Sequence, residues 1–235
     1  SDFEVELESA KLGNSSTVSA TCHIVGMPNW QRSKYVIGLR DMHSTSEDIL
    51  SILGNVVKKP LSEEVYSIID RAEWIDVRGT FGGRLNNFRV IGNLNSERGA
   101  ISTDVTLSKP NDGLALEGHV KSSHLDLGRL LNVGLLHGLD ARVDFKGSAE
   151  TMSLDDINAE LNLQIDSFGV GDYAYSDISA TGLMENGQYY SEVSSEDENM
   201  RFTLYAMADR REDVPHYGLS INLEHADLHA VGINR

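Results

Sequence analysis

The stretch INAELNLQID, residues Ile157–Asp166, alternates apolar and polar side chains without a break. Successive side chains of a β-strand point to opposite faces, so this pattern predicts a strand with one apolar and one hydrated face. The same alternation recurs at Phe3–Leu7, Ile101–Leu107, Ala141–Phe145 and Tyr217–Leu223. Short turns rich in Gly and Asn separate such stretches, as in antiparallel hairpins. We therefore expect an all-β chain of about thirteen strands, forming one long curled antiparallel sheet with a few short helices.

A second regularity is a motif that occurs three times, in which an alternating stretch runs into Asp-Leu or Asp-Ile and then into a short apolar helical stretch. Its aspartates are Asp48, Asp126 and Asp227, which lie 78 and 101 residues apart. Repetition at this scale predicts an architecture built by adding like units, which displays a long surface. Because aspartate before a short apolar turn is a favoured N-cap, we interpret the three aspartates as structural caps.

Helical patterns are few. Ser46 is placed to cap a helix over Glu47–Leu53, and Ser62 is placed to cap another over Glu63–Ala72. No Gly/Ser-rich linker or charge block divides the chain. We therefore expect residues 1–235 to form one segment built of repeated units, with a candidate seam at Asn55–Ser62.

Charge and cysteine content exclude several classes of protein. The 235 residues carry 36 acidic and 20 basic side chains, a net charge of −16, and the longest basic run is Lys58-Lys59. Nucleic acids and anionic lipid head groups attract clustered Lys and Arg, so we expect neither to bind. Cys22 is the single cysteine, which rules out an internal disulfide and a zinc site built on cysteines.

The ends of the chain give a further expectation. No stretch approaches the ~20 consecutive apolar residues of a membrane span, and the first residues lack the basic start and apolar run of a signal peptide. The chain begins inside a strand-like stretch and stops abruptly at Asn234-Arg235. We therefore expect it to be an excerpt of a longer protein.

The apolar strand faces need a partner. They can pack on a second sheet, close into a barrel, or cover something that is not protein. A curled, open sheet would form a trough suited to acyl chains, because each methylene moved out of water contributes about 0.8 kcal/mol. The candidate lining residues of such a groove are Ile101, Val105, Leu107, Val143, Phe145, Leu161, Leu163, Ile165, Phe202, Leu204, Leu219, Ile221 and Leu223.

Groups that carry chemistry do not converge in the sequence. His225 and His229 have the i, i+4 spacing of a metal pair, but a helix that begins near Asp227 would place them on different faces. Gly79–Gly83 lacks the Lys-Ser/Thr of a phosphate-binding loop, and Glu196–Asn199 lacks the ligand spacing and central Gly of an EF-hand. We therefore expect no catalytic residue, no cofactor and no metal, and a chain that is not an enzyme.

Three groups of motifs follow one another along the chain: Val77–Phe88 with Arg98–Val105, then Leu125–Leu131, then Gly171–Gly182 with Asp197–Met200. In order and spacing they resemble the TamB branch of the AsmA-like bridge-type lipid transfer proteins, in the form found in Bacteroidetes. The match runs from about Asp2 to Ile233, nearly the whole chain. The resemblance implies a periplasmic segment of an envelope-spanning protein, whose body is a curled β-sheet with an apolar groove, a taco-like half-pipe.

The resemblance also implies function and partners. Family members are anchored in the inner membrane by a segment absent here and reach a β-barrel partner in the outer membrane through parts outside this chain. The implied activity is non-enzymatic: phospholipid acyl chains move along the groove towards the outer membrane. The alternative is a scaffold for outer-membrane protein translocation and assembly, in which exposed strand edges pair with client strands. A carbohydrate-active or hydrolytic β domain would need convergent acids or a nucleophile with a base, and the sequence shows neither.

Overall fold

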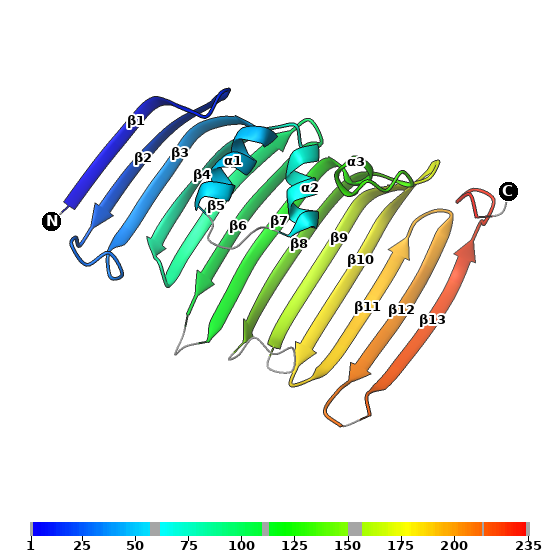
Figure 1. Ribbon diagram of the computed structural model, residues 1–235. Coiled ribbons are helices and arrows are strands. Elements are labelled where there is room, and N and C mark those ends of the chain that lie inside the picture. Colours follow the sequence, from blue (N-terminus) through cyan, green and yellow to red (C-terminus); the bar gives the residue numbers. More distant parts are fainter. Residues whose placement is uncertain (1, 57–61, 110–112, 150–156, 213, 234–235) are drawn as a thin grey trace.

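The computed structural model describes residues 2–56, 62–109, 113–149, 157–212 and 214–233. Within these ranges thirteen strands form one sheet, and each strand pairs antiparallel with the strands next to it in sequence, from β1 to β13 (Figure 1). The strands are β1 (Asp2–Leu12), β2 (Ser16–Val25), β3 (Lys34–Thr45), β4 (Trp74–Arg84), β5 (Asn87–Ser96), β6 (Gly99–Ser108), β7 (Leu114–Asp126), β8 (Leu136–Ala149), β9 (Ile157–Val170), β10 (Tyr173–Glu185), β11 (Gln188–Glu196), β12 (Met200–Asp209) and β13 (His216–Ala226).

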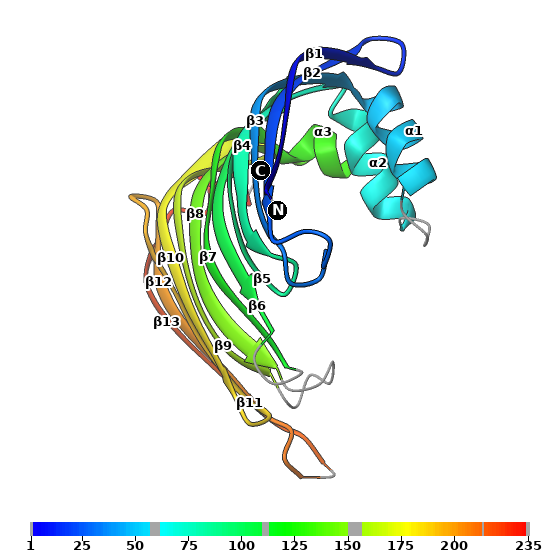
Figure 2. The same ribbon diagram turned by 90° about the vertical axis from the view of Figure 1, so that its left-hand side faces the viewer.

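The sheet bends along its strands, so that one face is concave and the other convex (Figure 2). It does not close on itself, and its edges are β1 and β13. The all-β, curled antiparallel sheet predicted from the alternating pattern is therefore confirmed. The strands are 9 to 14 residues long, longer than the usual ~5–6, which gives the trough its width.

Three short helices lie at one end of the strands, on the concave side (Figure 2). Helices α1 (Ser46–Val56) and α2 (Glu63–Arg71) connect β3 to β4, and α3 (Leu127–Leu131) connects β7 to β8. The Ser62 hydroxyl accepts a hydrogen bond from the backbone N–H of Val65 at 3.4 Å, so Ser62 is the N-cap of α2, as its sequence predicted. No helix in the described part of the chain is long and apolar enough to cross a membrane.

A small apolar core joins these helices to the sheet. Ala72 at the end of α2, Ile75 of β4 and Leu130 of α3 are buried together. Half-buried apolar residues from α1, α2 and three strands pack around them, namely Ile49, Ile68, Val77, Leu94 and Leu125. The helices therefore roof the concave face at one end of the strands.

Two of the three motif aspartates cap the turn that follows them. The Asp126 carboxylate accepts a hydrogen bond from the backbone N–H of Arg129 at 3.0 Å at the start of α3. The Asp227 carboxylate accepts from the backbone N–H groups of His229 and Ala230, at 3.1 and 2.9 Å, and these bonds lower its pKa. Both aspartates are structural caps, as the sequence predicted.

Asp48 differs from the other two. It lies inside the first turn of α1, and its carboxylate accepts from the backbone N–H groups of Ser15 and Asn14, at 2.9 and 3.1 Å, and from the Ser16 hydroxyl at 2.7 Å. These bonds, led by the one from Ser15, hold the pKa of the buried Asp48 carboxyl below its usual range. Asp48 therefore fixes the β1–β2 turn and does not cap its own helix. The sequence could not indicate this, because the partners lie more than thirty residues upstream.

The candidate seam at Asn55–Ser62 falls mostly on residues 57–61, which lie outside the described residues. On either side of it, β3 and β4 pair directly, from Tyr35 opposite Gly83 to Thr45 opposite Trp74. The sheet thus continues from β3 into β4 through backbone hydrogen bonds.

Candidate functional site

The concave face of the sheet carries four parallel rows of side chains, each with one residue from every one of the thirteen strands. Paired residues of antiparallel strands lie on the same face, so a row is followed from partner to partner across the sheet. We name each row after its first residue: the Phe3, Val5, Leu7 and Ala10 rows. The Val5 row comprises Val5, Cys22, Ile37, Phe81, Val90, Val105, Gly118, Phe145, Leu161, Gly182, Ser191, Ala206 and Leu219.

None of the four rows contains an acidic, basic, histidine, asparagine or glutamine residue. The Phe3 row runs to Tyr217, the Leu7 row to Ile221 and the Ala10 row to Leu223. Apart from tyrosines, their polar members are Thr103, Ser122, Ser191 and Ser195. The Ala10 row includes Val77 and Leu94, which pack against the helix core, so the rows face the side on which the helices lie.

The residues that alternate with the members of these rows point to the convex face, and many of them are polar or charged. Asp104, His119 and Asp144 stand side by side on β6, β7 and β8. Arg89 donates two hydrogen bonds to the Asp104 carboxylate, and Arg142 donates two to Asp144, each at 2.9 Å. These bonds lower the pKa of both carboxyl groups. The bridges are exposed, so they contribute little to stability and mainly keep this face hydrated.

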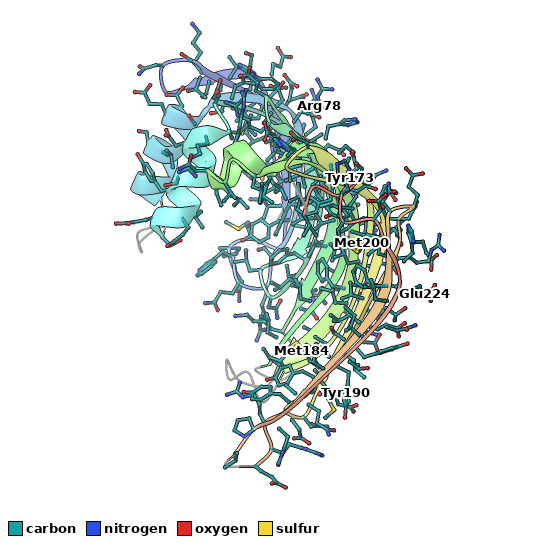
Figure 3. The ribbon with its side chains drawn as sticks, turned by 90° about the vertical axis from the view of Figure 1, so that its right-hand side faces the viewer. Arg78, Tyr173, Met184, Tyr190, Met200 and Glu224 are labelled. Atoms are coloured by element: carbon teal, nitrogen blue, oxygen red, sulfur yellow. The ribbon has the colours of Figure 1, made fainter. Side chains whose placement is uncertain are left out.

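The apolar rows remain largely uncovered away from the helices. A hollow of about 810 Å³ lies along β7 to β13, lined by members of the Phe3 and Val5 rows such as Leu116, Phe145, Leu161 and Met184. Figure 3 shows Met184 on the same side as the helices, while Glu224 points to the other side. This part of the concave face can accept an apolar ligand without moving any described element.

The convex face has an apolar patch of its own. Leu183, Tyr190, Tyr205 and Met207 are exposed on β10, β11 and β12 and border a hollow of about 640 Å³. Figure 3 shows Tyr190 on the side away from the helices. Acidic residues lie among them, including Glu160 and Glu192, and this patch does not continue across the sheet. The uninterrupted apolar surface is therefore on the concave side.

All thirteen lining candidates from the sequence lie on the concave face, distributed over the four rows. Their contact with lipid stays a prediction. The N-terminal members of the same rows, such as Tyr35, Ile37 and Phe81, were not among the candidates. The register of β3 shifts between Leu39 and Met42, so these two residues share the concave face although they lie three positions apart.

The acidic turn at Glu196–Asn199 contains the most buried aspartate of the described residues. Asp197 is 1% exposed and accepts hydrogen bonds from the Tyr173 hydroxyl at 2.6 Å and from the backbone N–H groups of Ser176 and Asn199. Burial opposes its ionisation, but these bonds outweigh that effect and lower the pKa of Asp197. Burial and the bond to Asp197 raise the pKa of Tyr173. The network ties the β11–β12 turn to β10 and has a structural role.

Among the residues with described positions, no group of three or more His, Cys, Asp or Glu side chains is arranged to hold a metal ion. His225 lies in β13, one residue before its end, and His229 lies in the turn capped by Asp227, so the two belong to different elements. Gly79 and Gly83 lie within β4 and pair with β5. The candidate site is therefore the apolar concave face itself.

No protein-family model, curated protein or solved structure matches this chain. The geometry of the concave face and the motifs of the sequence are therefore the features that indicate a function.

Proposed function

We propose that this chain is a non-enzymatic conduit that carries phospholipids between membranes, with their acyl chains in the concave trough. The observation that supports the proposal most is the set of four uncharged rows that cross all thirteen strands. Thirteen strands at ~4.8 Å spacing give a trough about 60 Å long. A ligand that moves along it meets an apolar surface at every strand.

The width of the trough also fits an acyl chain. The four rows occupy alternate residues, as at Tyr217, Leu219, Ile221 and Leu223, and so span about 20 Å along a strand. Half of a bilayer's hydrocarbon core is about 15 Å thick. Acyl chains therefore fit within the apolar band, and the head group would remain at an open, hydrated rim.

We propose a periplasmic location, which is what the resemblance to the TamB branch implies. Exposed apolar faces are unusual in a chain that carries a net charge of −16 and is otherwise hydrophilic. A lipid cargo gives such a face a partner. Because only the acyl chains contact the trough, this mechanism needs no catalytic group.

Native mass spectrometry of the purified protein tests the proposal. We expect bound phospholipid in the wild type, and loss of it in Leu163→Lys, because Leu163 lies in the Leu7 row between Val143 and Ala180. The matched control is Asn162→Lys, which places the same charge on the convex face next to Asp144. A wild type that never carries lipid, or two variants that lose lipid equally while both stay folded, would contradict the proposal.

A second candidate function is a scaffold for outer-membrane protein assembly, and the observation that favours it is that β1 and β13 each pair with one strand only in the described part of the chain. A client strand would add to an edge through backbone hydrogen bonds. Site-specific crosslinking in cells separates the two functions. Crosslinks from edge residues to unfolded barrel strands favour the scaffold, whereas lipid crosslinks from Leu163 favour the conduit.

A further inference from the structure

The convex face carries a groove that is made of two adjoining hollows. One hollow, of about 440 Å³, crosses β6 to β10, and the other, of about 640 Å³, crosses β9 to β13. Both are bordered by Glu160 and Leu183, so together they form one depression from Thr106 to Ser220, which we call the convex groove. Its eight strands, at ~4.8 Å spacing, make it about 34 Å long, which is the length of about ten residues of extended chain.

One end of the convex groove is apolar and aromatic. Tyr190 and Met207 are direct partners across β11 and β12, and Leu183 of β10 pairs with Tyr190 on its other side. Tyr205 lies two residues before Met207 on the same strand, and all four side chains are 40–51% exposed. Each belongs to a strand that is paired on both sides, so this exposure does not depend on where the sheet ends. Tyrosine and methionine are enriched at protein interfaces.

The polar part of the lining is acidic. Four glutamates border the convex groove, namely Glu117, Glu160, Glu185 and Glu192, whereas Lys146 is the one basic side chain among the described lining residues. None of the four glutamates forms an ion pair with a residue of known position. Their charges are therefore available to a cation from outside the chain.

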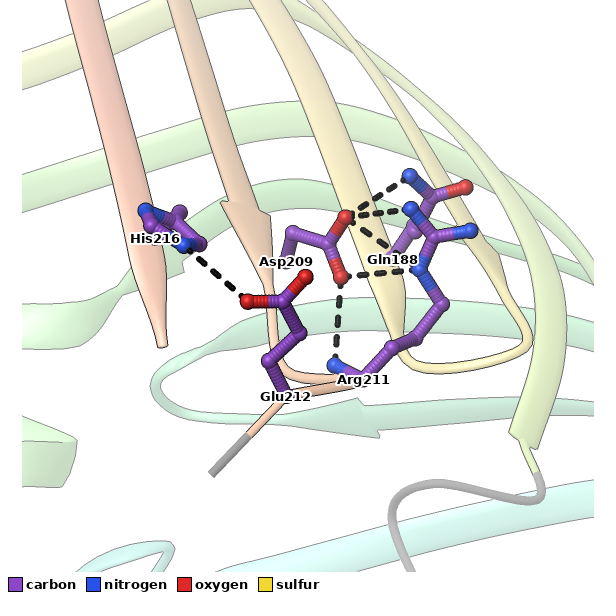
Figure 4. Close-up of polar contacts among 5 residues, drawn as sticks. All are labelled: Gln188, Asp209, Arg211, Glu212 and His216. Carbon is purple, nitrogen blue, oxygen red and sulfur yellow. Dashed lines mark hydrogen bonds and ion pairs between the residues drawn. The ribbon is translucent and has the colours of Figure 1, made fainter. Parts of the chain in front are cut away.

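Other carboxylates of the convex face have partners within the chain. Asp104 and Asp144 are each bound by an arginine. Figure 4 shows the same arrangement in the turn after β12, where the Asp209 carboxylate accepts hydrogen bonds from the Arg211 side chain and from the Gln188 amide, the latter at 3.1 Å. Arg211 is thus already engaged and does not neutralise the groove glutamates.

We propose that the convex groove is a docking site for an extended, basic segment of a partner protein. An apolar side chain of that segment packs against Tyr190 and Met207, and its lysine or arginine side chains bind the groove glutamates. The charges are complementary, because the described lining has four carboxylates and one ammonium group. Such complementarity selects the partner and speeds its approach, and the net charge of −16 acts in the same direction.

Tyr205 and Glu192 form the centre of the proposed contact. They are direct partners across β11 and β12, so an aromatic ring and a carboxylate lie side by side. A lysine or arginine placed over the ring gains a cation–π interaction and an ion pair at the same point. The neighbouring residues of β13, Gly218 and Ser220, are small and leave room for a ligand. This docking site lies on the convex face, so it stands whether or not the concave trough carries lipid.

Fluorescence anisotropy with a labelled ten-residue synthetic peptide that alternates lysine and leucine tests the proposal. We expect the wild-type protein to bind it, and Tyr205→Ala to weaken binding at least tenfold, as at an interface hot spot. The matched control is Tyr217→Ala, which removes an exposed tyrosine from the concave face and should leave binding unchanged. Glu192→Gln should weaken binding about twofold to fivefold, whereas Glu224→Gln, on the convex face outside the groove, should not.

Two further changes separate the contribution of charge from that of apolar contact. Binding should weaken at least fivefold at 1 M salt, where the Debye length is about 3 Å. A peptide with glutamate in place of lysine should not bind, because the groove would repel it. A peptide with serine in place of leucine should bind at least tenfold more weakly, because it lacks the apolar anchor.

Several results would overturn the proposal. They are no binding of the lysine–leucine peptide at low salt, equal binding of the glutamate peptide, or equal weakening by Tyr205→Ala and Tyr217→Ala while circular dichroism shows both variants folded. Sedimentation of the free protein gives one more check. A dimer that Tyr205→Ala dissociates would assign the convex groove to a second copy of the chain and would also contradict the proposal.

Discussion

Leu130 links the helical roof to the sheet, and its truncation gives a quantitative prediction. It is 9% exposed and packs with Ala72 and Ile75. Leu→Ala in a core costs about 2–5 kcal/mol. The surrounding side chains of this small cluster are themselves half-buried at a rim and can close part of the cavity, so we expect Leu130→Ala to lower the free energy of unfolding by about 2–3 kcal/mol. In a chain of this length that corresponds to a fall in Tm of about 5–10 °C.

The control is the next residue of the same helix. Leu131→Ala is the same Leu→Ala replacement, with the same change in helix propensity. Because Leu131 is 45% exposed, this replacement removes little buried apolar surface. We expect it to cost less than about 1 kcal/mol. Urea unfolding followed by tryptophan fluorescence would report the effect near the roof, because Trp74 begins β4 beside Ile75. Far-UV circular dichroism would follow the whole sheet. Equal destabilisation by the two variants would refute the assignment of Leu130 to the core.

Three further predictions test the turns and the close backbone contacts. The pKa of Asp197 is lower in the folded state than in the unfolded state, so its ionised carboxylate stabilises the fold above about pH 4. This stabilisation disappears as the pH falls further. Asp197→Asn should therefore flatten the acid side of a plot of Tm against pH. Gly128→Ala would place a Cβ 1.9 Å from a backbone oxygen, so it should lower the free energy of unfolding in urea by about 1–3 kcal/mol. The control is Gly134→Ala, whose Cβ would have no atom within 4 Å and which should be tolerated. Asp126→Ala removes the N-cap of α3 and should cost about 1 kcal/mol in the same assay.

The period-2 pattern was sufficient to predict the sheet, because each strand places its apolar residues on one face. Ile157–Asp166 indicated β9, and the capping signal at Ser62 indicated α2 at the right place. The lining candidates share a face for the same reason, since alternation fixes which side chains point together. These are local properties, which neighbouring residues determine.

What the sequence could not predict depends on long-range contacts. The β-bulge of β3 between Leu39 and Met42 is one example, because it depends on how β3 pairs with β4. The partners of Asp48 lie in a turn far upstream, and Asp197 accepts a hydrogen bond from Tyr173 of β10. Alternation also cannot indicate whether a second sheet covers the apolar face. That answer came from the arrangement of all thirteen strands in one layer.

The order of the strands has a consequence for how the chain acquires its structure. In the described sheet each strand pairs only with its neighbours in sequence, so most of the pairings join parts of the chain that lie close together, and the longest connection is the one through α1 and α2 between β3 and β4. Closing a short loop costs little conformational entropy, and a low contact order favours rapid folding. The sheet can therefore grow by addition from the first strand towards the last as the polypeptide emerges during synthesis. Each completed hairpin then serves as the template for the next strand.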